Sequence, residues 1–480
     1  MKASVPIWTR GVSLRRFCRL ERDLKADVAV IGAGMAGILT AHRLSEAGAR
    51  VVVLEAKRVA GGQTRRTTAK LTSQHGMIYD ALIQKFGAEK AGKYARANEA
   101  AIREYAEMIS RLGIECGWRE TCAYLYTKTA DEPMRREAEA AASLGINASF
   151  TAETELPFRI RGAVRFGGQA MFSPLKLISP IIESLEIYED TRVISVKGKS
   201  VITERGTVTA DKVVFAAHYP FVNIPGWYFM RMHQERSYVL ALKSNWLPRG
   251  MYYGADAGAL SFREADGLLL AGGESHRTGE NSTGGRYEAL LRKAREAFPE
   301  CEETARWSAQ DCITADGIPY IGRYSRAEPD WYVATGFGKW GMSASMAAAM
   351  IICGDIIGKP PEWGDVFSPA RFNLAAVSKN LKTEIVVSCK SLAREWLTFP
   401  KTALDSLPVG HGGIVMADGV KAGVYKDENG QCHIVSTRCP HLGCQLEWNP
   451  DELSWDCPCH GSRFGYDGKL IDNPAQKNIK

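Results

Sequence analysis

A strand–turn–helix–strand pattern near the N-terminus limits most strongly how this 480-residue chain can fold. The stretch "ADVAVIGAGMAGILTAHRLSEAGARVVVLEA" joins two apolar runs through a glycine-rich turn and a helical period. Gly32 permits a tight turn, Gly34 lets a pyrophosphate approach the backbone, and Gly37 lets the helix pack closely on the strand. Glu55, at the end of the second run, is placed to accept hydrogen bonds from ribose hydroxyls. The pattern predicts a Rossmann-type dinucleotide site, and the acid disfavours a 2′-phosphate.

Two further glycine-rich stretches could complete such a site. "GGQTRRTTAKLTSQHG" begins at Gly61 and could wrap the rest of a long cofactor. "WYVATGFGKWGMSASMAAAM" begins at Trp331 and indicates a strand, a turn and a second helix start, whose positive end could face a flavin ring. A purely structural strand–turn–helix is the alternative for this second stretch. The candidate cofactor contacts here are Gly62, Thr68, Gly336, Gly341 and Met342.

Length and charge restrict the class of protein. A chain of this length is expected to form two or three domains, and 45% hydrophobic with 24% charged residues is typical of a globular protein. The net charge of +7 is small and both signs alternate along the chain, so no nucleic-acid partner is expected. No segment is long enough to span a bilayer, and residues 345–358 are predicted to form a buried helix. We expect a cytoplasmic protein.

The middle of the chain predicts a second structural unit. Helical periodicity marks residues 80–115 and 131–144. Short β-rich runs within residues 236–273 favour an antiparallel sheet. The predicted fold class is therefore α/β, with a Rossmann-type domain and an antiparallel-sheet substrate domain, followed by a small all-β domain from about residue 401.

A cluster of soft metal ligands lies close to the C-terminus. Cys439-x-His441 is followed, after fifteen residues, by Cys457-x-x-His460. Two thiolates and two imidazoles could hold tetrahedral zinc. Zinc leaves two further cysteines at fixed offsets unexplained, and these are Cys444 and Cys459.

From about residue 26 to 370 the chain resembles the FAD-dependent oxidoreductases of the D-amino-acid oxidase type, which include glycine, sarcosine and glutamylputrescine oxidases. The resemblance rests on the first glycine motif with Glu55 and on "TVTADKVVFAA", "TADGIPYIG" and "ATGFGKWGMS". It implies FAD bound by residues about 26–80, 190–220 and 310–360, with the Val193 backbone at the adenine. Relatives usually show a glycine where this chain has His218.

The same resemblance implies oxidation of a C–N bond of an amine or amino acid. Candidate residues near the flavin ring are Trp340, Lys339, His276, Arg263 and His75. Arg263 or Lys339 could pair with a substrate carboxylate. Some relatives attach the flavin through a cysteine in the region of Cys312, but the local register does not clearly match.

Over its last 80 or so residues the chain resembles the Rieske [2Fe–2S] domain. The resemblance implies Cys439, His441, Cys457 and His460 as cluster ligands, and a disulfide between Cys444 and Cys459. Ser462 matches a serine that donates a hydrogen bond to a cluster sulfur. Relatives of high potential often carry a tyrosine where this chain has Phe464, so we predict the lower or middle part of the Rieske range, roughly −150 to +300 mV.

Together these observations predict an FAD- and Rieske-dependent oxidoreductase. Its predicted parts are an oxidoreductase region at 1–375, a linker at 376–400 and a Rieske domain at 401–480. Electrons would pass from an amine or amino acid to FAD, then through the cluster to an external acceptor. The alternatives are an NAD(P)H-dependent electron-transfer reductase serving a partner enzyme, and a redox sensor that uses the cluster as a switch.

Overall fold

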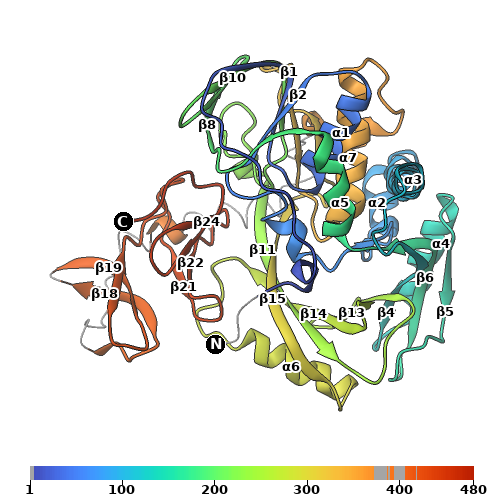
Figure 1. Cartoon of the computed structure of the whole chain (residues 1–480). Helices are drawn as coiled ribbons and strands as arrows, with labels where there is room; N and C mark the ends of the chain where they lie inside the picture. The colour runs from blue at the N-terminus through green and yellow to red at the C-terminus, as the bar shows by residue number, and fades with distance from the viewer. Residues whose placement is uncertain (1–4, 372–385, 387–389, 394–405, 418) are drawn as a thin grey trace.

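The computed structural model describes residues 5–371, 386, 390–393, 406–417 and 419–480. Two β-sheets with their helices form the larger part of the molecule, and a group of short strands from the C-terminal part lies against them (Figure 1). The predicted linker at 376–400 lies outside the described residues, apart from 386 and 390–393. The division of the chain at that linker stays a prediction.

The first sheet carries the predicted nucleotide-binding pattern. β1 pairs in parallel with β2 and β10, and β10 with β17, so their carboxyl ends meet at one edge. β2 consists of four buried residues, "VVVL", because interior strands of such a sheet are covered on both faces. In spatial order the strands are β16 (Tyr320–Arg323), β17 (Trp331–Thr335), β10 (Thr207–Phe215), β1 (Leu24–Ile31), β2 (Val51–Leu54) and β7 (Glu186–Tyr188), with the hairpin β8 (Val193–Lys197) and β9 (Ser200–Thr203) on β10.

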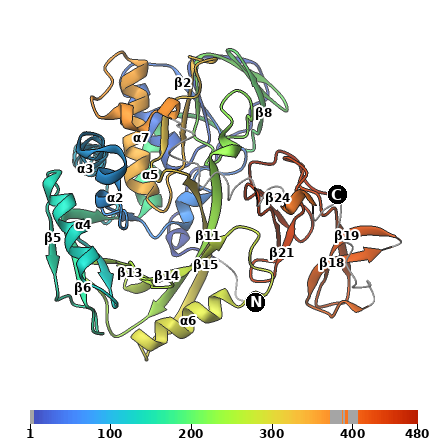
Figure 2. The ribbon, with the colours of Figure 1, turned by 180° about the vertical axis from the view of Figure 1, so that it is seen from behind.

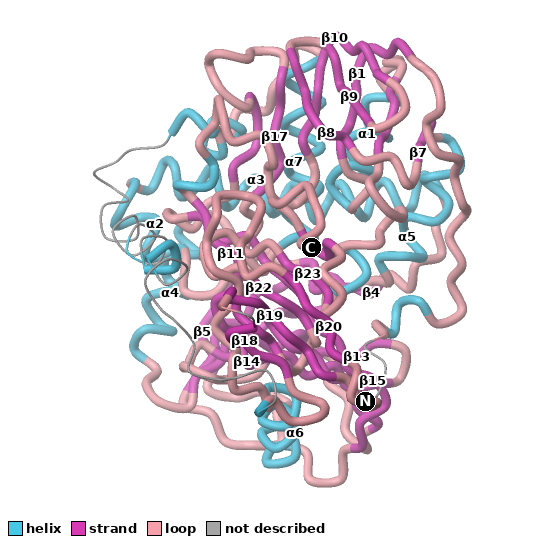
Figure 3. The backbone as a smooth tube through the Cα atoms, turned by 90° about the vertical axis from the view of Figure 1, so that its left-hand side faces the viewer, coloured by secondary structure: helices cyan, strands magenta, loops and turns pink. Residues whose placement is uncertain are grey.

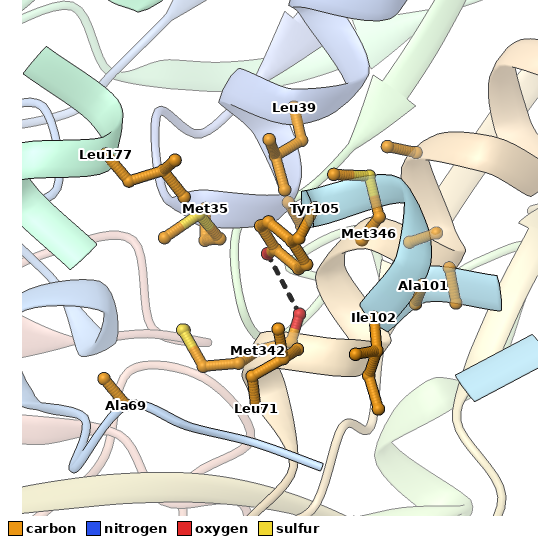
Figure 4. Close-up of a cluster of buried hydrophobic side chains, with 14 of the residues drawn as sticks. Met35, Leu39, Ala69, Leu71, Ala101, Ile102, Tyr105, Leu177, Met342 and Met346 are labelled. Atoms are coloured by element: carbon orange, nitrogen blue, oxygen red, sulfur yellow. Dashed lines mark hydrogen bonds between the residues drawn. The ribbon is translucent and has the colours of Figure 1, made fainter. Parts of the chain in front are cut away.

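Beside this sheet α1 and α7 pack together, whereas α6 packs on the second sheet (Figure 2). Tyr105 donates its hydroxyl to the carbonyl of Met342, at 3.0 Å, and so fixes the start of α7 within a cluster of apolar side chains (Figure 4). The predicted helix at 80–115 is divided in two at Gly87, whose φ of +83° interrupts the helix. The helices are α1 (Met35–Glu46), α2 (Tyr79–Phe86), α3 (Ala88–Leu112), α4 (Glu132–Ser143), α5 (Pro174–Ile181), α6 (Arg286–Ala297) and α7 (Gly341–Ile356).

The predicted buried helix at 345–358 is the greater part of α7. Its residues are buried on nearly every side from Met342 to Gly354, as expected for a helix that is apolar all round and lies inside a large domain. Among the described residues, no helix combines the length and the apolar character that crossing a membrane requires.

The second sheet confirms the antiparallel pattern expected within residues 236–273, since β11, β13 and β14 pair in this way and β12 pairs antiparallel with β13. β12 also pairs in parallel with β4, although the two strands lie far apart in the sequence. In spatial order the strands are β15 (Glu302–Thr314), β11 (Met232–Lys243), β14 (Leu268–Arg277), β13 (Ser261–Ala265), β12 (Met251–Gly254), β4 (Arg119–Thr127), β6 (Gly162–Met171) and β3 (Lys70–Leu71), with β5 (Ala148–Thr151) on β6.

The C-terminal part is built from strands, as the predicted fold class requires, and lies in front of the larger part in Figure 3. Its core holds Trp455, Phe464 and Leu446, none of which is exposed. One sheet contains β18 (Gly412–Ala417), β19 (Val420–Lys426) and β20 (Cys432–Val435), and the other contains β21 (Glu447–Asn449), β22 (Ser454–Asp456), β23 (Arg463–Gly465) and β24 (Leu470–Asp472).

Candidate active site and metal centre

A cavity of about 330 Å³ opens at the carboxyl ends of β1, β2, β10 and β17. Its lining includes the residues that directly follow each of these strands, among them Gly32, Glu55, Ala216 and Gly336. Parallel sheets bind nucleotides at this edge, where the strand order reverses and helix N-termini converge. The cavity is therefore the candidate cofactor site.

The three glycines of the first motif have separate structural tasks. Gly32 has φ +107°, and a Cβ there would lie 2.6 Å from the carbonyl oxygen of Ala216. Gly37 does not line the cavity; a Cβ there would lie 1.9 Å from the carbonyl oxygen of Gly32. Gly34 lines the cavity at the N-cap of α1. Gly37 thus sets the helix against the strand, and Gly34 offers the backbone to a ligand.

Glu55 lies at the end of β2 and lines the cavity. Its carboxylate accepts the amide protons of Ala33 and Lys57, each at 2.9 Å. Burial raises the pKa of the Glu55 carboxyl, and the two amide hydrogen bonds act against this rise. The carboxylate is held in place by backbone donors, which fits a group that presents an oxygen to a ribose.

The cavity also fits a diphosphate. Its lining includes several cationic residues close to the first glycine motif, Lys57, Arg65, Arg66 and Arg192. The Nε of Arg65 is buried and has no hydrogen-bond partner among the described residues. A buried guanidinium donor without an acceptor is costly, and an anionic ligand in the cavity would satisfy it. The sequence interpretation did not single out these cations, although two of them stand in "GGQTRRTT".

The structure brings most of the predicted cofactor contacts to this cavity. Two of them do not line it: Gly37 packs against Gly32, and Thr68 instead accepts a hydrogen bond from Arg263 at its carbonyl, at 3.0 Å, while the neighbouring Thr67 lines the cavity. α7 begins at Gly341, so its N-terminal amides face the same space. The predicted contacts that line the cavity are Gly32, Gly34, Glu55, Gly62, Val193, Gly336, Gly341 and Met342.

His218 occupies the position where relatives usually show a glycine. Its φ is +67°, a left-handed conformation that glycine adopts without strain and histidine does not. The side chain lines the cavity, and its Nε2 is buried without a hydrogen-bond partner among the described residues. Its carbonyl oxygen accepts the hydroxyl of Thr335 at 2.6 Å. The strained residue therefore presents an unsatisfied ring nitrogen at the cofactor cavity.

A group of polar side chains on and beside the second sheet adjoins the cavity. Asp311 and Lys339 both line it, with an oxygen–nitrogen distance of 3.9 Å. Lys339 also donates to the hydroxyls of Ser237, at 2.8 Å, and Ser275, at 2.9 Å. Glu235, directly opposite Asp311 in the strand register, lies 3.4 Å from Lys339. These residues form what we call the polar cluster: Glu235, Ser237, Ser275, Asp311 and Lys339.

The pKa values of the two carboxyl groups in the polar cluster are shifted in opposite directions. Burial raises the pKa of Asp311 to about 6. The pKa of Glu235 falls to about 2, chiefly through its contact with His233 and then through the charge of Lys339. Two carboxylates close to one ammonium thus have very different affinities for a proton, which is a common property of functional sites. Asp311 was not among the sequence candidates, because a single acid in a strand carries no distinctive spacing.

The other predicted catalytic residues lie outside the cavity lining. Trp340 stacks on His75 with ring centroids 4.8 Å apart, and His75 accepts or donates a hydrogen bond at Tyr94, at 2.6 Å. His276 uses both ring nitrogens, one with Tyr238 at 3.1 Å and one with the carbonyl of the next residue at 2.7 Å. Each of these two residues directly follows a member of the polar cluster in the sequence, Trp340 after Lys339 and His276 after Ser275.

Arg263 is directed away from the cavity. Its guanidinium donates to main-chain carbonyls, including that of Thr68 at 3.0 Å, and its side chain is buried beside Trp8. Burial lowers the pKa of this guanidinium to about 9. Because these carbonyls already occupy its donors, the geometry favours a structural task for Arg263 over the predicted pairing with a substrate carboxylate.

The thiol of Cys312, considered above for covalent flavin attachment, donates to the carbonyl of His218 at 3.4 Å. It does not line the cavity, and burial raises its pKa well above the ordinary thiol value. A buried thiol with a raised pKa is a poor nucleophile. This geometry gives no support to a covalent link.

Two short loops bring the predicted cluster ligands together. Gly443 donates its amide to the carbonyl of Cys439, and Gly461 donates to that of Cys457, each at 2.9 Å. Both glycines have positive φ, +83° and +78°. The two loops thus turn in the same way, and each presents one cysteine and one histidine to the other loop.

The ligand atoms are arranged to hold a metal. The rings of His441 and His460 lie with centroids 4.9 Å apart. The Nδ1 of His441 is buried without a hydrogen-bond partner among the described residues, while its Nε2 contacts Asn223 at 2.9 Å. The side chains of Cys439 and Cys457 contact each other, and this contact lowers the pKa of Cys439 and raises that of Cys457. Two neighbouring cysteine side chains and a histidine nitrogen that is available to bind iron fit an iron–sulfur cluster.

The structure contains the disulfide bond between Cys444 and Cys459, and it joins the two loops. The sulfur atoms of Cys444, Cys457 and Cys459 lie within 4.8 Å of one another. The Ser462 hydroxyl hydrogen-bonds with Cys439, and its hydrogen bond to a cluster sulfur stays a prediction. Phe464 is fully buried in the same core.

The family model described as FAD dependent oxidoreductase matches residues 27–354. The chain belongs to this family. A second model, that of the Rieske [2Fe-2S] domain, matches residues 402–480. The cofactors of the chain are therefore FAD and a Rieske [2Fe–2S] cluster, and the zinc alternative is not needed.

Individual proteins are similar to this chain in sequence or in fold. The chain is 36% identical over 490 residues to the Rieske 2Fe-2S iron-sulfur protein YhfW of Bacillus subtilis (strain 168), a match that covers 98% of this chain and 96% of YhfW. Glycine oxidase from Geobacillus kaustophilus has a TM-score of 0.62 at 19% identity, covering 73% of this chain and 100% of that one. L-amino acid deaminase from Proteus myxofaciens has a TM-score of 0.60 at 18% identity, covering 75% and 96%. These two structures show the fold alone.

Proposed function

We propose that this FAD-dependent oxidoreductase oxidises a C–N bond of an amine or amino acid and passes the electrons through its Rieske cluster to an external acceptor. One observation carries the proposal: the glycine turn of the cofactor motif and the pair formed by Asp311 and Lys339 line the same cavity. A substrate held by this pair would lie beside the cofactor. The fold likeness to a glycine oxidase and an amino acid deaminase supports the substrate class by analogy.

The polar cluster suits a zwitterion. Lys339 offers a positive charge to a carboxylate, and the nearby charge of Asp311 favours its protonated form. The carboxylate of Asp311 lies 3.9 Å from the ammonium of Lys339. When ionised, it offers a negative charge to the substrate ammonium. With a pKa of about 6, Asp311 can also accept a proton from that ammonium near neutral pH. Asp311 would bind and deprotonate the amine, and Lys339 would orient the acid group.

When bound, FAD would accept a hydride, and the cluster would transfer electrons one at a time. The chain's own residues join the two sites. Gln310 lines the cavity and donates its side-chain amide to the carbonyl of Gly461, in the second cluster loop, at 2.8 Å. Gln234 donates to the carbonyl of His460 at 2.6 Å. These contacts hold a ligand loop close to the cavity, which supports an electron outlet within one chain.

The test is an anaerobic mixing experiment with the full-length protein. A panel of amines and amino acids is compared with NADH and NADPH, and flavin absorbance is followed together with the reduced-cluster EPR signal. We expect at least one amine or amino acid to bleach the flavin, followed by growth of the cluster signal. Bleaching by a nicotinamide alone would overturn the proposal in favour of a reductase for a partner enzyme. A cytoplasmic location stays part of the proposal, to be tested by cell fractionation.

A further inference from the structure

The cofactor cavity has one wall that the FAD-dependent part of the chain does not supply. Its lining includes Leu470, Ile471, Asp472, Asn473 and Gln476, all from the Rieske domain. We call residues 470–476 the closing segment. It comprises β24 and the residues that follow, and Figures 1 and 2 both place β24 on the side of the Rieske domain that faces the first sheet.

The closing segment is attached on both sides of the cavity. On the ribose side, Lys57 donates its ammonium to the carbonyls of Leu470, at 3.0 Å, and Ile471, at 2.9 Å. On the side of β10, Asn473 donates its side-chain amide to the carbonyls of Ala217, at 2.8 Å, and Tyr219, at 2.7 Å. Lys57 and Ala217 line the cavity themselves. The closing segment therefore joins two walls of the cavity.

A buried charge network fixes the segment further. Burial by itself would raise the pKa of Asp472, but Arg463, Arg66 and Arg236 hold it well below the usual carboxyl range. Arg66 lines the cavity, and Arg236 is fully buried and donates to Glu452 of the Rieske domain at 2.8 Å. An ionised Asp472 thus lies among cations that belong to both parts of the chain. Removing it from them would leave buried charges without a partner.

The segment is also connected to the cluster. The amide of Ala475 donates to the hydroxyl of Ser462 at 3.0 Å, and that hydroxyl hydrogen-bonds with Cys439. The loop that supplies Ser462 contains His460 and Gly461, both of which accept hydrogen bonds from the second sheet through their carbonyls. The position of the closing segment and the fold of the cluster loop therefore depend on each other.

We infer that the closing segment of the Rieske domain is part of the FAD-binding site, and that FAD enters or leaves the cavity after this segment detaches. FAD bound in the cavity and the docked Rieske domain then stabilise each other by linkage. The inference uses the FAD site of the chain and is independent of the substrate class, so a failure of the amine proposal leaves it standing.

The test is the rate of FAD release from the full-length, FAD-loaded protein carrying Asn473→Ala. The substitution removes both side-chain hydrogen bonds to Ala217 and Tyr219, so we expect FAD, measured by its fluorescence on release, to dissociate about tenfold faster or more. The control is Asn429→Ala, the same change at an exposed turn of the same domain. A release rate equal to that of the unchanged protein, with the cluster EPR signal intact, would overturn the inference.

A second measurement covers the case in which Asn473→Ala does not fold. Hydrogen exchange of the unchanged protein is compared with FAD bound and with FAD removed. We expect the amides of residues 470–476 to exchange more slowly with FAD bound, while the β19–β20 turn around Asn429 is unaffected. Equal exchange of the closing segment in both states would show that it is not part of the site.

Discussion

The cofactor cavity and the cluster centre bind their groups in different ways. The cavity collects residues from stretches that span the chain from Ile31 to Gln476. The centre uses two loops of the last domain, closed by local glycine turns and one disulfide. A site made of many weak contacts loses affinity in steps. A site made of four ligand bonds fails when one bond is removed.

The largest effect is expected at a cluster ligand. His460→Ala removes one of the predicted iron ligands, so the Rieske EPR signal should disappear while reduction of the flavin by substrate is retained. His411→Ala, at an exposed position in the same domain, is the control and should keep the signal. A persistent signal in the first variant would contradict the ligand assignment. Loss of flavin reduction in a folded His460→Ala protein would contradict the outlet model.

In the cavity, a substitution at Asp311 is expected to lower the activity strongly without abolishing it. Asp311→Asn removes the charge that we assign to the substrate ammonium, so kcat/KM should fall roughly 100-fold. Because the pKa of Asp311 is about 6, its carboxylate is protonated below that pH, and the activity of the unchanged protein should decline as the pH falls through 6.

The Asp311→Asn variant should not show this decline in activity at low pH, which we call the acid limb of the pH profile. Asp211→Asn, an exposed acid on β10, should keep both the rate and the limb. An acid limb that survives in Asp311→Asn would assign the titration to another group.

The contact between the two sites can be tested with a pair of glycines. A Cβ at Gly461 would lie 2.6 Å from that of Gln234 and would be strained at φ +78°. Gly430 has φ +81°, and a Cβ there would have nothing within 4 Å. Gly430→Ala therefore introduces backbone strain of about 1 kcal/mol without a steric clash. Gly461→Ala should lower the melting temperature by more than Gly430→Ala. Equal shifts would mean that the domain contact contributes nothing to stability.

The smallest effect concerns the cluster potential. Phe464→Tyr places a hydroxyl where relatives of high potential carry one. A net hydrogen bond of about 1 kcal/mol to a cluster sulfur corresponds to roughly 40 mV for one electron, so the midpoint potential should rise by that order. Tyr466→Phe, two residues further on, is the control and should leave the potential unchanged. An unchanged potential in Phe464→Tyr would show that the hydroxyl does not reach the cluster.

The two sites also differ in how far the sequence alone predicts them. All four proposed cluster ligands lie within 22 residues, and their spacing is set by two tight turns, so local sequence is enough to propose them. The glycine motif and Glu55 are local in the same sense, and both lie at the cavity edge as expected, with Gly37 in its packing position. Thr67 lines the cavity in place of the predicted Thr68, because a loop has no period from which the direction of each side chain could be predicted.

Charged candidates were harder to place. Arg263 and Lys339 look alike as carboxylate ligands in the sequence. In the structure one is directed to main-chain carbonyls and the other to the cavity. Asp311 acquires its raised pKa from burial on β15, beside a strand, β11, that it meets only in the folded sheet. Neither fact follows from residue type or spacing.

By itself the sequence determined the family-level features: a parallel sheet with a dinucleotide turn, an antiparallel sheet and a cluster domain, because each depends on short-range periodicity or ligand spacing. Only the tertiary structure decided which charges share the cavity and that residues 470–476 form one of its walls. The bonds from Lys57 and Asn473 join residues more than 250 positions apart. Contacts of this kind depend on how two domains pack, which no local pattern of side chains encodes.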